Sequence, residues 1–133
     1  MYYYAMSTPE CLFCDKDNPD KNTVIASNDL AYARWDNFPA SDGHTEIVPI
    51  RHVESFFDLN DQEVLAIYAL AKVTREIITA KYHPDAFNLG VNDGEAAGRT
   101  IHHMHLHLIP RYEGDVPNPR GGIRHVIPGK ADY

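Results

Sequence analysis

Four of the chain's eight histidines fall within six consecutive residues, 102–107. Three of them, His103, His105 and His107, alternate with residues that are apolar. Successive side chains of an extended strand point to opposite faces, so these three imidazoles are expected to share one face. A row of imidazoles is costly when it is buried without partners, but it is useful for binding a metal ion or transferring a phosphoryl group. The row therefore predicts one of these two kinds of chemistry.

The chain has two cysteines, Cys11 and Cys14, separated by two residues. In a reducing compartment this spacing indicates a metal site or a redox pair more than a structural disulfide. Two thiolates do not complete a tetrahedral zinc site, but histidines can supply the two missing ligands. The other interpretation is a pair of unrelated buried thiols.

The loop before the histidine row carries groups that bind phosphate. Asn92 offers an amide, Arg99 a guanidinium and Thr100 a hydroxyl, and the glycines between them free backbone N–H groups. Such groups hold phosphate oxygens in many proteins. The loop therefore favours phosphate chemistry over a metal cluster built from the row alone.

The composition is that of one globular domain, with 133 residues of which 44% are hydrophobic and 23% charged. A net charge of −7 argues against a general nucleic-acid partner, which needs a basic surface, but leaves room for a small anionic ligand. No apolar run approaches the length of a membrane span, and the start of the chain has no signal-peptide pattern. We therefore expect a cytoplasmic protein without a membrane partner.

Residue patterns predict five strands and one long helix. The helix is expected to begin after Asn60, with Glu63 completing a capping box, and to end before Pro84, and a shorter helical turn is expected within 53–59. The strands are expected at residues 23–26, 30–36, 44–50, 87–92 and 101–112.

Three strands, a helix and two further strands do not alternate as they would in a parallel sheet. This order favours an α+β fold, with a five-stranded, mostly antiparallel sheet and one long helix and a short helix packed on it. Residues 1–10 are expected to form an N-terminal arm, residues 11–112 the domain, and residues 113–133 an irregular tail rich in Pro and Gly.

The segment 103–109 resembles the signature of the histidine-triad (HIT) superfamily, in which three histidines alternate with apolar residues. Residues 11–14 resemble the zinc-binding cysteine pair of its bacterial members. Further segments are similar to the family's motifs in the expected order, namely 43–53, 92–94 and 98–100. The tail is similar to that of members described as dinucleoside polyphosphate hydrolases. The resemblance implies a HIT-like fold, a purine nucleotide substrate and a homodimer formed through the helix and the fourth strand.

The resemblance also implies different roles for the three histidines. His105 would attack the α-phosphorus of a nucleotide and form a nucleotidyl-histidine, from which water releases a nucleoside monophosphate. His107 would donate a proton to a phosphate oxygen or to the leaving group. His103 would either complete a structural zinc site with Cys11, Cys14 and His52, or orient His105.

The resemblance implies a nucleotide-binding set around these histidines. Asp36 matches the family's ribose-binding acid, and Asn37 follows it close to the base. Asn92 and Thr100 would hold phosphate oxygens. Arg99 replaces a Gln of many members and would favour a substrate with more phosphate charge, with the tail contributing to the same site.

The leading hypothesis is thus a hydrolase of dinucleoside polyphosphates or related nucleotide conjugates that works through a nucleotidyl-histidine. The alternatives are a nucleoside phosphoramidase, a nucleotidyl transferase, a slow nucleotide-binding regulatory module, or a metal-binding module that uses the triad itself. His44 is expected to be structural, and His102 to point away from the triad.

Overall fold

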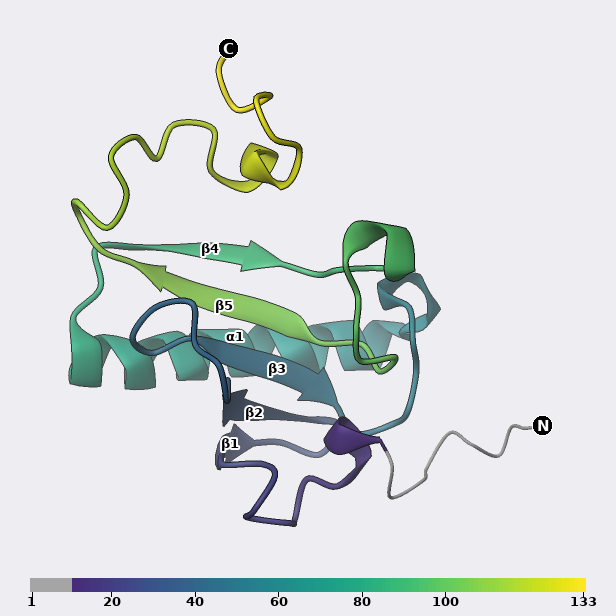
Figure 1. Ribbon diagram of the computed structural model, residues 1–133. Coiled ribbons are helices and arrows are strands. Elements are labelled where there is room, and N and C mark those ends of the chain that lie inside the picture. The colour runs from purple at the N-terminus through teal and green to yellow at the C-terminus, as the bar shows by residue number, and fades with distance from the viewer. Residues whose placement is uncertain (1–10) are drawn as a thin grey trace.

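Figure 1 shows the computed structural model, an open five-stranded sheet with a long helix across one face. The structure describes residues 11–133, so the predicted arm 1–10 lies outside the described residues. All neighbouring strands are antiparallel, and their order is β1-β2-β3-β5-β4. The strands are β1 (Val24–Ser27), β2 (Ala31–Trp35), β3 (Thr45–Pro49), β4 (Ala86–Gly90) and β5 (Leu106–Arg111). The predicted α+β class is confirmed.

The long helix α1 (Asp61–Tyr82) begins and ends where the sequence predicts. The side chain of Asn60 accepts from the Glu63 N–H at 2.8 Å, and the Glu63 carboxylate accepts from the Asn60 N–H at 3.0 Å, which forms a capping box. His83 ends the helix in the left-handed conformation, directly before Pro84. Within residues 11–133 no helix is long and apolar enough to cross a membrane.

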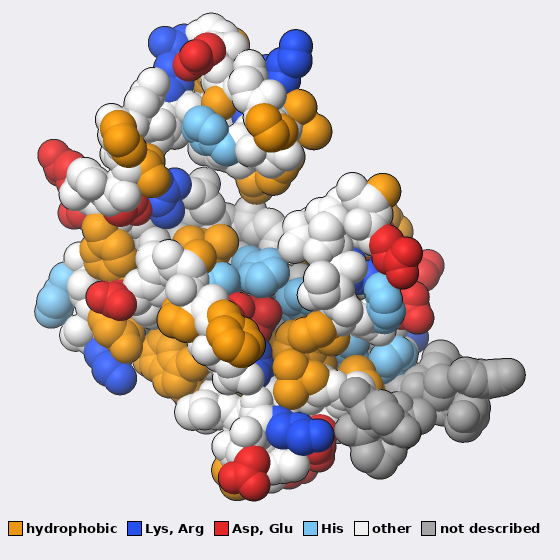
Figure 2. All heavy atoms as spheres, viewed as in Figure 1, with side chains coloured by type: hydrophobic (Ala, Val, Ile, Leu, Met, Phe, Trp, Pro, Cys, Tyr) orange, Lys and Arg blue, Asp and Glu red, His pale blue; other side chains and the backbone are white. Residues whose placement is uncertain are grey.

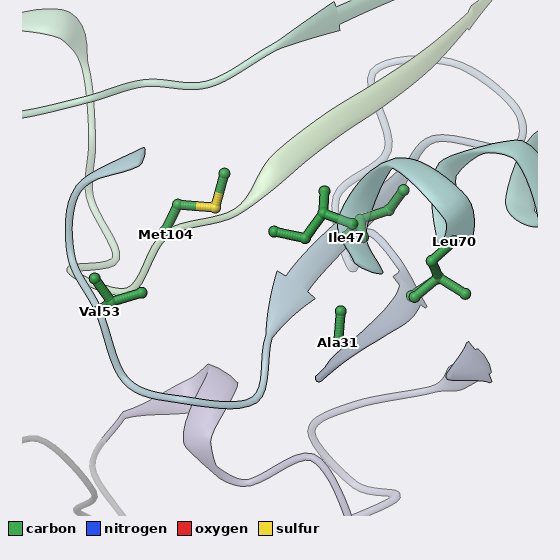
Figure 3. Packing of buried hydrophobic residues seen from close by; sticks show 7 residues of the cluster. Ala31, Ile47, Val53, Leu70 and Met104 are labelled. Carbon is green, nitrogen blue, oxygen red and sulfur yellow. The ribbon is translucent and has the colours of Figure 1, made fainter. Parts of the chain in front are cut away.

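The main hydrophobic core lies between α1 and the sheet, and Figure 3 shows part of it. Its members include Ala31, Ala33, Ile47, Leu70 and Met104. Because neighbouring residues of a strand point to opposite faces, the residues between these apolar ones lie on the other face of the sheet. That face is not covered by α1 and holds the functional groups described below.

The fifth strand is shorter than predicted. Its ladder begins at Leu106 instead of Ile101, and residues 101–105 approach it through a bend. A tertiary contact explains the late start of the strand, because the Met104 N–H donates to the Val53 carbonyl at 2.7 Å and not to β3. The alternation of side chains nevertheless persists, because Met104 is buried in the core under α1.

The predicted short helix within 53–59 is a single 3-10 turn, η3 (Phe56–Asp58). Between residues 11 and 133, three other short turns have the same form: η2 (Leu12–Cys14), η4 (Glu95–Ala97) and η5 (Gly122–Val126). The last belongs to the tail, which is otherwise irregular and runs past β4 in Figure 1.

Candidate active site and metal centre

The ring of His105 is held in one tautomer by its own backbone neighbour. Its Nδ1 donates to the carbonyl of His103 at 2.8 Å, which leaves the lone pair on Nε2. Burial lowers the pKa of His105 below its ordinary value, so the ring is neutral at pH 7. A neutral imidazole with a fixed, unprotonated Nε2 is suited to act as a nucleophile.

A second histidine fixes the opposite tautomer in His107. The Ala40 N–H donates to Nδ1 of His44 at 2.9 Å, so a neutral His44 carries its proton on Nε2. That nitrogen lies 2.9 Å from Nδ1 of His107 and donates to it, which leaves the proton of His107 on Nε2. The rings of His105 and His107 are 5.0 Å apart, so they present a lone pair and an N–H group side by side.

His44, which is expected from the sequence to be structural, contributes its ring to this chain of hydrogen bonds. Burial lowers the pKa of both His44 and His107, so both rings are neutral at pH 7. His102 lies apart from these rings, as expected, and its side chain contacts Arg99 and Glu95 at the surface.

A cavity of about 270 Å³ opens beside these rings and brings together most of the predicted substrate-binding residues. Figure 2 shows histidines in the hollow of this face. The predicted residues that line the cavity are Asp36, Asn37, Asn92, Thr100, His105 and His107. Residues from four separate parts of the chain therefore meet at one site.

Asp36 follows the end of β2, and its carboxylate contacts both the next loop, at Phe38, and the ring of His44. Its Oδ1 accepts from the Phe38 N–H at 2.7 Å, and its Oδ2 lies 3.5 Å from Nε2 of His44. The first contact fixes the carboxylate at the rim of the cavity, where it can accept hydrogen bonds from hydroxyl groups of a ligand.

Arg99 does not join the other predicted residues at the cavity. Its Nε donates to Nδ1 of His102 at 3.0 Å, and its Nη1 donates to the Glu54 carbonyl at 3.1 Å. Its Nη2 also lies 3.3 Å from the Glu54 carboxylate. The guanidinium is thus held against the loop after β3, away from the residues that line the cavity.

The four predicted metal ligands converge, with their ligand atoms all within 4.8 Å of one another. Sγ of Cys11 lies 3.4 Å from Nδ1 of His103, and Sγ of Cys14 lies 3.2 Å from Nδ1 of His52. The two imidazole Nδ1 atoms are 3.2 Å apart. Ligands of tetrahedral zinc lie about 3.3 to 3.8 Å from one another at normal bond lengths, so these three distances are close to those of a zinc site.

The chemistry of these side chains also suits a cation. Nε2 of His103 donates to the Pro49 carbonyl at 2.8 Å, which leaves Nδ1 free to be a ligand, and burial lowers the pKa of His103 to about 4. Burial and the nearby Cys11 raise the pKa of the Cys14 thiol to about 12. Ionising the Cys14 thiol is therefore unfavourable without a cation, and a Cys₂His₂ set is typical of structural zinc.

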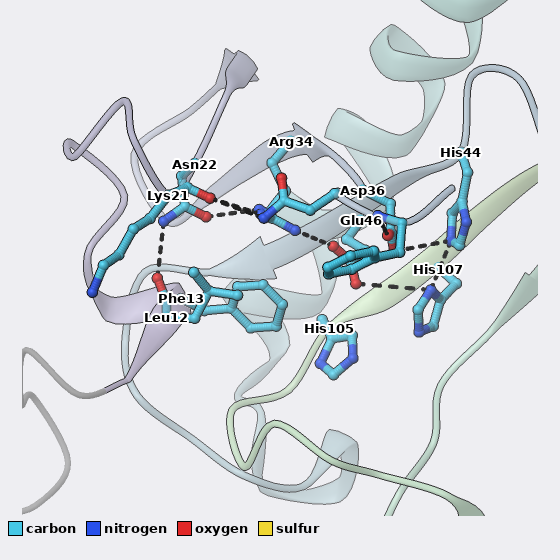
Figure 4. Close-up of polar contacts among 12 residues, drawn as sticks. Leu12, Phe13, Lys21, Asn22, Arg34, Asp36, His44, Glu46, His105 and His107 are labelled. Atoms are coloured by element: carbon cyan, nitrogen blue, oxygen red, sulfur yellow. Dashed lines mark hydrogen bonds and ion pairs between the residues drawn. The ribbon is translucent and has the colours of Figure 1, made fainter. Parts of the chain in front are cut away.

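A buried ion pair that the sequence analysis missed lies in the same cavity (Figure 4). Arg34 and Glu46 are direct partners across β2 and β3, and their exposed fractions are 2% and 4%. Oε2 of Glu46 lies 3.9 Å from Nδ1 of His107, which is the residue opposite Glu46 in β5. Burial, together with the nearby Asp36 carboxylate, raises the pKa of Glu46 to about 7. The sequence offers one signal for this pair, which is a charged residue among the mostly apolar residues of each strand.

Comparison with known proteins identifies the family. A family model described as HIT domain matches residues 18–114, and the chain belongs to this family. A 16.1 kDa HIT-like protein of Mycoplasma pneumoniae is 32% identical over 110 residues, which are 82% of this chain and 76% of that protein.

Two further relatives carry more specific descriptions. The chain is 34% identical over 97 residues to the AP-4-A phosphorylase of Mycobacterium tuberculosis, and it matches 72% of its own length but only 50% of that enzyme. The crystal structure of a Zn-bound histidine triad family protein from Mycobacterium smegmatis superposes with a TM-score of 0.73 at 29% identity, covering 82% of this chain and 80% of that one. The predicted HIT-like fold is thereby confirmed.

Proposed function

We propose that this protein hydrolyses dinucleoside polyphosphates or related nucleotide conjugates at the α-phosphate and releases a nucleoside monophosphate. The hydrogen bond from His105 to the His103 carbonyl carries this proposal, because it leaves a nucleophilic Nε2 at the cavity. Membership of a family that includes an AP-4-A phosphorylase supports nucleotide chemistry at this site.

In the first step Nε2 of His105 attacks the α-phosphorus, and a P–N bond forms while the bond to the bridging oxygen breaks. The bridging oxygen accepts a hydrogen bond from Nε2–H of His107, which the contact with His44 holds on that atom, and the leaving phosphate departs as an anion. Asn92 and Thr100 donate to the phosphate oxygens, on which negative charge develops.

In the second step water attacks the same phosphorus and the P–N bond breaks. The attacking water releases a proton to solvent, His105 regains the lone pair on its Nε2, and His107 keeps its proton and stabilises the phosphate oxygens in this step as well. Asp36 accepts hydrogen bonds from the ribose hydroxyls and keeps the nucleotide aligned through both steps.

The test is to incubate the protein with diadenosine tetraphosphate and to identify the products. Hydrolysis gives AMP and ATP, and the His105→Ala variant should give neither above background. Added inorganic phosphate distinguishes a phosphorylase, since transfer of the AMP group to phosphate gives ADP and ATP. Absence of any product with wild-type protein, or full activity of the variant, would contradict the proposal.

We also propose that Cys11, Cys14, His52 and His103 hold a zinc ion. Four protein ligands leave no open position, so the ion would be structural and would supply no step of the reaction. It would fix η2 against the sheet. This matters for catalysis because Phe13, within η2, packs on the His105 ring at 4.8 Å.

We further propose a homodimer that forms through α1 and β4. The order of the sheet leaves β4 at an edge, paired only with β5 among the described strands. Large apolar side chains are exposed on the same elements, namely Val64, Leu65, Tyr68, Val73 and Leu89. Light scattering after gel filtration tests this proposal, and a monomer at micromolar concentration would contradict it.

A further inference from the structure

Arg34 is fixed at the floor of the cavity by contacts on several sides (Figure 4). Its Nε donates to Oδ1 of Asn22 at 2.7 Å, and its Nη2 donates to the Lys21 carbonyl at 3.0 Å. The guanidinium also lies over the ring of Phe13, 5.1 Å from its centre. A buried cation with this many contacts has little freedom to move.

Arg34 in turn orients the carboxylate of Glu46. Its Nη1 donates to Oε1 of Glu46, while Oε2 is directed toward His107. A buried ion pair is a weak source of stability, because a well-packed apolar pair of similar volume serves the fold as well or better. Stability is therefore a weak reason for these charges, and their position in the lining of the cavity indicates a role in binding.

The remaining lining indicates which part of a nucleotide meets this pair, if the proposed function is correct. The α-phosphate must reach His105, and the ribose must reach Asp36. Apart from the residues already placed at the phosphate and the ribose, the lining consists of Gly98, the apolar side chains of Leu12, Phe38 and Ile101, the amide of Asn37, and the Arg34–Glu46 pair, which is the only charged part of it. Apolar side chains suit the faces of a base, whereas a carboxylate suits the donor groups along its edge.

Resting on the proposed function, we infer that Glu46 reads the edge of the base and selects guanine nucleotides over adenine nucleotides. Guanine presents two adjacent donors, N1–H and the N2 amino group, and a carboxylate accepts from both. Adenine presents one amino group next to N1, whose lone pair faces a carboxylate unfavourably. Arg34 is the positioning residue that holds the carboxylate in place.

The experiment measures binding of GMP and AMP to the wild-type protein by calorimetry. These monophosphates are products, so their affinity does not depend on turnover. Since the pKa of Glu46 is raised to about 7, the titrations are made at pH 8, where the carboxylate is ionised. One charged, two-donor contact predicts at least about tenfold tighter binding of GMP.

Two variants test whether Glu46 causes this preference. Glu46→Gln has the same size but only one acceptor, so GMP should bind about tenfold more weakly and AMP should be unaffected or bind more tightly. If the single variant folds poorly because Arg34 loses its partner, the double variant Arg34→Phe/Glu46→Leu replaces the pair by apolar groups and should bind both nucleotides equally.

The outcomes separate this inference from the proposed function. Equal binding of GMP and AMP to the wild type, or a GMP preference that persists in the double variant, would overturn the role of Glu46 and leave the nucleotide site standing. Failure of both nucleotides to bind at millimolar concentration would overturn the proposed function as well.

Discussion

Nε2 of His44, the residue directly before β3, lies 2.9 Å from Nδ1 of His107 in β5. The Ala40 N–H donates to Nδ1 of His44, so the proton of His44 is on Nε2. His44 is therefore the donor, and Nδ1 of His107 is the acceptor. His44 therefore determines which nitrogen of His107 carries a proton. It acts through His107 and is a positioning residue for the proposed reaction.

Replacing His44 should slow nucleotide turnover without weakening nucleotide binding. We expect His44→Leu to lower kcat by about tenfold or more, because His107 can then place its proton on the wrong nitrogen. His44→Gln retains an N–H donor of similar reach and should recover part of the rate. Equal losses in the two variants would show that packing, and not the donated proton, accounts for the effect of His44.

The lowered pKa of His44 predicts that stability is lost in acid. The unfolded chain binds a proton at this residue near its ordinary pKa, while burial keeps the folded ring neutral to a lower pH. Below pH 6.5 the unfolded state therefore gains protons first, and the free energy of unfolding falls as the pH falls toward the folded pKa. Buried His107 shifts in the same direction.

Urea unfolding at pH 7.5 and pH 5.5 measures this loss. The His44→Gln variant lacks one of the titrating rings, so its stability should fall less between the two values than that of the wild type. Glu46 acts in the opposite sense, because its raised pKa favours stability at low pH, but it is common to both proteins and cancels from the comparison. An identical loss in both proteins would contradict this role of His44.

Gly43, directly before His44, should not tolerate a side chain. Its φ of +90° is a conformation that other residues adopt with strain, and a Cβ would lie 2.9 Å from Cδ2 of Tyr82 and 3.0 Å from Cγ2 of Ile78. We expect Gly43→Ala to cost about 1 to 3 kcal/mol of stability. In the matched control Gly114→Ala, φ is +83° but no described atom lies within 4 Å of the added Cβ, so thermal unfolding should show a smaller loss.

Local features of the chain were predictable from the sequence, and features that depend on tertiary contacts were not. The capping box of Asn60 and Glu63 spans four residues, so its pattern is visible directly in the chain. The start of β5 depends instead on a hydrogen bond between Met104 and Val53. Arg99 likewise contacts Glu54, a partner 45 residues away that no local pattern indicates.

In the candidate site, too, some features were predictable from the sequence and others depend on tertiary contacts. The spacing of Cys11 and Cys14 predicts a metal site, and the histidine row is visible directly in the sequence. The contact between His44 and His107 joins residues 63 positions apart, and it depends on the pairing of β3 with β5, which no local pattern indicates. The pairing of Arg34 with Glu46 required the register of β2 and β3, which depends on how the whole sheet assembles.

The zinc proposal predicts about one ion per chain, lost when a ligand is removed. Metal analysis of purified protein should find zinc in the wild type and in His102→Ala, a variant at an exposed histidine outside the cluster. Cys14→Ser should bind much less. If the folded chain alone binds zinc, free zinc at a hundredfold excess over Kd adds about 3 kcal/mol to the stability of the wild type.

The same experiment tests whether the ion supports the active site. Without zinc, η2 loses the attachment through Cys11 and Cys14 and keeps its hydrogen bonds from Tyr32 and Asn22, so Phe13 packs less firmly on His105 and both GMP and AMP should bind more weakly to Cys14→Ser than to His102→Ala. The loss should be equal for the two nucleotides, because Glu46 lies outside the metal cluster. Unchanged thermal stability of the wild type after chelation, with no zinc in the purified protein, would exclude a structural ion at this cluster.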